Sequence, residues 1–167
     1  MFGFYISLPF LLFALYRLYI VLYNYYSRPF LPTGKPADLP LVSVIVAEPN
    51  DDNSTKNLLN GLLNQTYQNI EVLVSVDANT QSIGILREYS SKDKRVKLVE
   101  GDNIPEGWLK RNYIRDILSQ QSNGQYIIFI SPDVYVESES VANMLSYMKL
   151  NGLSLLTVFP KQIAGNH

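Results

Sequence analysis

The chain has 167 residues and a mass of 19.0 kDa, about the size of one domain. A hydrophobic content of 47% with 17% charged residues excludes a disordered chain, and a formal net charge of −1 gives no electrostatic footprint for nucleic acid. The absence of cysteine and the single histidine, His167, exclude a disulfide framework, a zinc finger, a thiol nucleophile, a catalytic triad and a His-rich metal site.

Residues 1–26 are strongly apolar and aromatic, with Arg17 as their only charge. As a helix they would extend about 39 Å, enough to cross a hydrocarbon core about 30 Å thick. Tyrosines cluster around Arg17 like an aromatic belt, and basic residues follow the segment but do not precede it. We therefore expect a transmembrane or membrane-anchoring helix, which makes the protein single-pass with its domain facing the cytoplasm. An interfacial or partner-packed helix and a cleaved signal peptide are the alternatives.

Residues 27–40 contain four prolines and one glycine. Such a stretch propagates neither a helix nor a central strand, because proline removes a backbone donor and fixes φ. We interpret it as a Pro-rich linker between the N-terminal helix and the domain at residues 41–167.

From residue 41 onward, short β-branched runs alternate with amphipathic segments. The runs predict strands at 41–46, 70–76, 96–100, 126–130 and 153–159. The amphipathic segments predict helices at 55–65, 81–90, 110–121 and 138–150, the first with Ser54 as its N-cap. This alternation is typical of an α/β fold: a Rossmann-like, doubly wound, mostly parallel sheet, here preceded by one N-terminal hydrophobic helix.

Ligands of such sheets bind at the carboxyl ends of the strands. Carboxylates follow four of the predicted strands, within residues 47–51, 77–80, 101–108 and 131–133. No G-x-G-x-x-G follows the first strand and no G-x-x-x-x-G-K-[ST] occurs, which argues against a dinucleotide fold of that type and excludes a P-loop. Any phosphate would then be bound by a divalent cation and basic side chains.

Four blocks of sequence carry a family resemblance: LVSVIVAEPND, QTYQNIEVLVSVDANT, PEGWLKRN and GQYIIFISPDV. In this order and spacing they resemble the nucleotide-binding half of a family 2 glycosyltransferase with a GT-A fold, over roughly residues 40–159. The PEGWLKRN block after a membrane segment is most similar to members that glycosylate lipids. The resemblance implies a membrane-anchored enzyme that binds a nucleotide-diphospho-sugar, expected to be a UDP-sugar, for inverting transfer to a lipid or polysaccharide acceptor.

The resemblance also implies residues that bind the nucleoside. Asn50 and Asp51 match the family's Asn-Glu after the first strand, where the backbone cradles the nucleoside. Asp77 matches the second Asp of the pair after the second strand, which contacts the base and ribose, while Val76 stands where the first Asp would be.

The metal and the diphosphate are implied by the later blocks. Asp133 matches the last Asp of the D-x-D motif, which in the family ligates Mn²⁺ or Mg²⁺ on the diphosphate; Ser131 replaces the first Asp. Trp108 matches the Trp, and Arg111 the Lys, of the G-W-x-G-K stretch, with Lys110 in place of its glycine. One carboxylate fewer weakens metal binding without forbidding it, and Arg111 is able to pair with phosphate directly.

In the family an acceptor-binding half follows, with the catalytic base and a Q-x-x-R-W motif. The only tryptophan here is Trp108, and no residue after Asp133 matches the base, so we assign no catalytic residue. We expect a donor half that is incomplete at its C-terminus. The alternatives are a catalytically inactive, truncated nucleotide-sugar-binding module, and an unrelated nucleotide-binding α/β domain in which no cleft joins Asp77 and Asp133.

Overall fold

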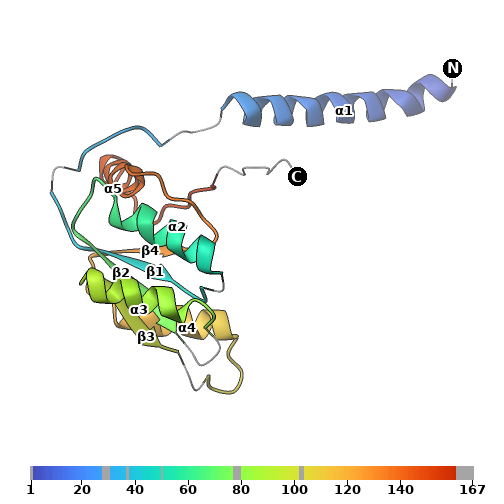
Figure 1. Ribbon diagram of the computed structural model, residues 1–167. Coiled ribbons are helices and arrows are strands. Elements are labelled where there is room, and N and C mark those ends of the chain that lie inside the picture. The colour runs from blue at the N-terminus through green and yellow to red at the C-terminus, as the bar shows by residue number, and fades with distance from the viewer. Residues whose placement is uncertain are drawn as a thin grey trace. The chain divides into compact units, whose positions relative to one another are not determined.

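The computed structural model in Figure 1 describes residues 2–27, 31–36, 38–49, 51–76, 80–101 and 104–160. The chain forms two compact units, Met1–Pro32 and Thr33–His167, which we describe separately.

The described residues of the first unit form one helix, α1 (Phe2–Tyr26). Its stretch Ser7–Tyr26 has a mean hydropathy of 1.4. Twenty residues rise about 30 Å in an α-helix, close to the thickness of a hydrocarbon core. By length and composition, α1 therefore meets the requirement for a membrane span.

The second unit is built on a sheet of four parallel strands. The strands are β1 (Val42–Val46), β2 (Ile70–Val76), β3 (Val96–Glu100) and β4 (Tyr126–Ile130). Their order is β3-β2-β1-β4, so β1 lies between β2 and β4. Val42 pairs with Ile70 on one side and with Tyr126 on the other.

Helices cover both faces of this sheet (Figure 1). They are α2 (Asp52–Leu63), α3 (Ile83–Lys92), α4 (Lys110–Gln120) and α5 (Ser140–Leu150). Val44 of β1 packs in one apolar cluster with residues of α2, α3 and α5, whereas its neighbour Ile45 packs with Ile114 and Leu118 of α4. Successive strand residues face opposite sides of a sheet, so β1 is buried on both. The predicted doubly wound α/β fold is confirmed.

The expected fifth strand at 153–159 is wrong. These residues form no strand, and the side chains of Leu155 and Phe159 are exposed. A strand requires a hydrogen-bonded neighbour, and within the described residues β4 pairs only with β1. Apolar β-branched composition was therefore not sufficient for a strand at this position.

The expected N-cap of α2 is also wrong. Asp51, not Ser54, caps the helix: the Ser54 amide donates a hydrogen bond to Asp51 Oδ2 at 2.7 Å, and the Thr55 amide donates to the Asp51 carbonyl at 2.9 Å. Asp51 has an extended backbone, as an N-cap requires, so the helix begins earlier than predicted.

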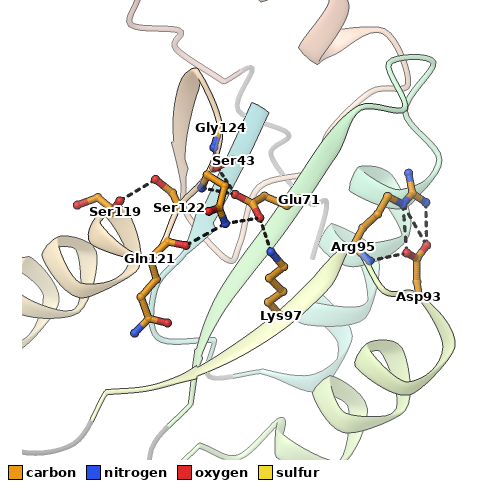
Figure 2. Close-up of polar contacts among 10 residues, drawn as sticks. Ser43, Glu71, Asp93, Arg95, Lys97, Ser119, Gln121, Ser122 and Gly124 are labelled. Carbon is orange, nitrogen blue, oxygen red and sulfur yellow. Dashed lines mark hydrogen bonds and ion pairs between the residues drawn. The ribbon is translucent and has the colours of Figure 1, made fainter. Parts of the chain in front are cut away.

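Glu71 is a buried carboxylate near the amino ends of the strands, and its role was not predicted from the sequence. Glu71 of β2 accepts hydrogen bonds of 2.6 Å from Ser43 Oγ, from the Asn123 amide and from Lys97 Nζ, as Figure 2 shows for its labelled partners. Burial raises the pKa of Glu71, but these hydrogen bonds outweigh it and lower that pKa to about 2. The ionised Glu71 carboxylate therefore links β2 to β1, to β3 and to the segment before β4 through hydrogen bonds.

Gly124 lies very close to Ser43, the residue whose hydroxyl donates to the Glu71 carboxylate. The Gly124 amide donates to Ser43 Oγ at 2.8 Å, and a Cβ at this position would lie 2.5 Å from the Ser43 nitrogen. Only glycine permits this approach without a backbone shift.

Candidate functional site

The candidate site lies where the order of the strands reverses. From β1 the chain runs outward through β2 to β3, and then returns through α4 to place β4 on the other side of β1. The carboxyl ends of β1 and β4 are therefore adjacent, with α4 packed on one face, and such a switch point is where open α/β sheets bind ligands. A pocket of about 180 Å³ opens there. It is lined by Ala47, Glu48, Arg111, Arg115, Ile130, Ser131, Pro132 and Asp133.

Three of the sequence-predicted residues meet in this pocket: Arg111, Ser131 and Asp133. The Ser131 hydroxyl contributes most to lowering the pKa of Asp133, followed by the Asp133 backbone amide. Burial opposes them, and the charge of Arg111 lowers the pKa by less than burial raises it. The pocket thus holds an ionised carboxylate together with a guanidinium group and the hydroxyl that donates to that carboxylate.

This set of side chains fits a hard divalent cation that arrives with its ligand. Mg²⁺ is usually held by one or two carboxylates, with phosphate oxygens and water completing its shell. Asp133 is exposed and is able to supply one carboxylate, and Ser131 a neutral oxygen. Among the described residues no group of three or more His, Cys, Asp or Glu side chains is able to hold a metal ion alone. The metal would therefore depend on the phosphates of the ligand.

Two other predicted residues lie outside the pocket lining. Asp51 is occupied as the N-cap of α2, and the hydrogen bond from the Ser54 amide lowers its pKa. Trp108 is half-exposed and packs edge-on against Tyr113, with ring centroids 5.7 Å apart. It follows Gly107, whose φ of 87° turns the chain in a way that favours glycine.

The remaining two predicted residues, Asn50 and Asp77, lie outside the described residues. Their contacts with a nucleoside stay predictions, as does the cleft between Asp77 and Asp133. The pocket seen here is smaller than the roughly 300–1,000 Å³ of sites that enclose a drug-sized ligand.

Two residues of the pocket lining, Glu48 and Arg115, were not predicted from the sequence. Glu48 contacts Lys110 Nζ at 3.6 Å and Arg111 Nε at 3.3 Å. A signal for both existed in the sequence. Glu48 lies two residues after the end of β1, and Arg115 lies one helical turn after Arg111, on the same face of α4.

The comparisons with known proteins agree with this geometry. The model of glycosyl transferase family 2 matches residues 43–166. An uncharacterized glycosyltransferase of Haemophilus influenzae is 32% identical over 117 residues, which cover 70% of this chain and 45% of that protein. The chain spans less than half the length of the curated relatives it matches.

Solved structures share the fold. S. aureus TarS 1-349 in complex with UDP-GlcNAc matches with a TM-score of 0.55 and 25% identity, over 66% of this chain and 32% of that chain. The mannosyltransferase PcManGT from Pyrobaculum calidifontis, in complex with GDP-Man and Mn²⁺, matches with a TM-score of 0.59 and 19% identity, over 78% of this chain and 39% of that chain. With a family model that covers most of its length, the chain belongs to glycosyl transferase family 2, as the motifs indicated.

Proposed function

We propose that the chain is a membrane-anchored donor-binding domain of a glycosyltransferase. It binds a nucleotide-diphospho-sugar, with a UDP-sugar as the expected donor, together with Mn²⁺ or Mg²⁺. The sugar is then transferred with inversion to a lipid or polysaccharide acceptor. In this proposal α1 anchors the chain in the membrane and the sheet domain faces the cytoplasm, in line with the basic residues that follow α1.

The observation that carries the proposal is the meeting of Asp133, Ser131 and Arg111 at the switch point. A diphosphate needs both a cation and hydrogen-bond donors. Asp133 supplies the carboxylate for a bridging metal, and Arg111 supplies a charged group that pairs with phosphate oxygens. Ser131 and Asp133 lie in the segment after β4 and Arg111 lies in α4, and these segments are brought together only by the fold.

The experiment is calorimetric titration of the 167-residue chain in detergent micelles with UDP-GlcNAc and with GDP-mannose, in Mn²⁺ and in EDTA. We expect binding that is markedly tighter in Mn²⁺. The substitution Asp133→Asn should weaken the Mn²⁺-dependent binding about tenfold or more, equivalent to about 1.4 kcal/mol. It should leave the weaker binding in EDTA unchanged or slightly improved, because a negative charge is removed.

Glu137→Gln is the matched control. It also removes one exposed negative charge from the segment after β4, but it does not line the pocket. An equal loss in both variants would show a general charge effect. No metal-dependent binding of either donor by the folded chain would contradict the proposal.

One observation favours a second function, a binding module without turnover. Ser131 adds no charge where the family has a carboxylate, so the metal is held less strongly than by two carboxylates. Such a module would bind the donor yet release no sugar, either to water or to acceptors. Measuring turnover of a radiolabelled donor on membranes that carry the chain separates the two functions.

A further inference from the structure

Glu48 occupies an unusual position at the edge of the pocket. It is the only residue other than glycine with a positive φ in the described part of the chain, at 54°. This left-handed conformation is costly for a glutamate, and such strain clusters at functional sites. Its amide donates a hydrogen bond to Ser75 Oγ at 2.8 Å, which holds the backbone in place.

The strained backbone places the Glu48 carboxylate between two cations at the start of α4. Arg111 Nε lies 3.3 Å and Lys110 Nζ 3.6 Å from its oxygens. The Glu48 side chain is 19% exposed, whereas that of Arg111 is 68% exposed. The anion is therefore held by the fold, while the guanidinium group reaches it from solvent.

Ion pairs of this exposure are weak, roughly 0–1 kcal/mol each, and a ligand that carries several negative charges can displace them. A diphosphate that took over Arg111 and Lys110 would leave the Glu48 carboxylate facing it. Like charges at such short range repel, unless a divalent cation neutralises them.

We propose that Glu48 is a built-in competitor for the diphosphate of the donor. It holds Arg111 and Lys110 at the pocket before the donor arrives, and it makes donor binding depend on the divalent cation. The inference rests on the proposed function and deepens it: Glu48 is a positioning residue that penalises the metal-free donor.

The test compares Glu48→Asn with Glu48→Asp. Both replacements tolerate a left-handed backbone, and they differ only in charge. UDP is titrated into the 167-residue chain in micelles, in Mn²⁺ and in EDTA. We expect Glu48→Asn to tighten UDP binding in EDTA about fivefold, a change of about 1 kcal/mol, with little change in Mn²⁺. Glu48→Asp should keep the wild-type ratio of the two dissociation constants.

Two further variants locate the effect. Glu88→Gln removes a negative charge that pairs with Lys92 outside the pocket, and it should leave both dissociation constants unchanged. In an Arg111→Gln background the gain from Glu48→Asn should be smaller, because one of the two cations for which Glu48 competes is then absent while Lys110 remains.

The outcomes separate this inference from the proposed function. Equal or weaker UDP binding by Glu48→Asn in EDTA overturns the inference, and so does an equal gain in Glu48→Asp, which would trace the effect to strain. If the wild type binds no UDP in either buffer, the proposed function fails. Inorganic pyrophosphate then serves as the probe: tighter binding by Glu48→Asn than by the wild type supports the competitor role, and no difference overturns it.

Discussion

Glu71 lies near the amino ends of the parallel strands and Glu48 lies just beyond their carboxyl ends. Each contacts at least one basic side chain. Glu71 is 4% exposed and accepts three hydrogen bonds of 2.6 Å, from Lys97, Ser43 and the Asn123 amide. Glu48 is partly exposed, makes contacts of 3.3 and 3.6 Å, and carries a strained backbone.

The difference shows how one side-chain type serves two purposes. The oxygens of Glu71 are buried, and two of their three donors, the Ser43 hydroxyl and the Asn123 amide, are held in place by the fold, so a ligand has nothing to gain there. The partners of Glu48 are long, exposed side chains whose interactions with it are weak. A carboxylate of the first kind stabilises the domain, and one of the second kind leaves its cations available to a ligand.

The substitution Glu71→Ala should have the largest effect on stability. It leaves Ser43, the Asn123 amide and Lys97 without their shared acceptor, and we expect a loss of about 3 kcal/mol in the free energy of unfolding. Urea unfolding of the chain in micelles, followed by circular dichroism, measures it. Glu88→Ala, on an exposed helix surface, is the control and should be almost neutral. Equal effects of the two substitutions would contradict a structural role for Glu71.

The pH dependence of stability sharpens the same contrast. The pKa of Glu71 is about 2 in the folded chain, against 4.5 for an ordinary glutamate. A lowered pKa contributes stability that is complete above pH 4.5 and is lost as the pH falls towards 2. The stability difference between the wild type and Glu71→Gln should therefore narrow over that range. A difference that stays constant down to pH 2 would show that Glu71 is not held ionised.

The smallest expected effect is an increase in the free energy of unfolding. Glu48→Asn relieves a left-handed glutamate, and we expect it to raise the free energy of unfolding by about 0.5–1 kcal/mol. The same urea titration measures the change. Glu48→Asp should stabilise similarly, because the relief comes from the backbone. Destabilisation by both variants would show that the contacts of Glu48 with α4 matter for the fold.

Most of the secondary structure was predictable because each element has a local pattern. The β-branched run at β1 and the leucine stripe of α2 both produce their elements as expected, and their ends shift by only a few residues. The prediction failed at residues 153–159, where a strand depended on a neighbour that the pattern does not encode.

The site was predictable to a smaller degree. Ser131 and Asp133 follow β4, so the rule of strand ends and the family motif both pointed to them. Arg111 lies in the first turn of α4, and the family motif pointed to it. Glu48 also follows a strand, but nothing local distinguished it from Asp51, which caps a helix instead. The φ of Glu48 and its distance to Arg111 separate the two roles, and neither follows from the local sequence.

The order of residues along the chain was enough to establish the α/β alternation, the apolar N-terminal helix and the family motifs, since these depend on neighbours a few positions apart. The tertiary structure decided that the Glu71 carboxylate is buried and hydrogen-bonded and that the Glu48 carboxylate lines the pocket. Glu71 and Glu48 each meet partners more than 20 residues away along the chain, at Lys97 and Arg111. The burial and charge pairing that set their behaviour arise only when the sheet and α4 have assembled.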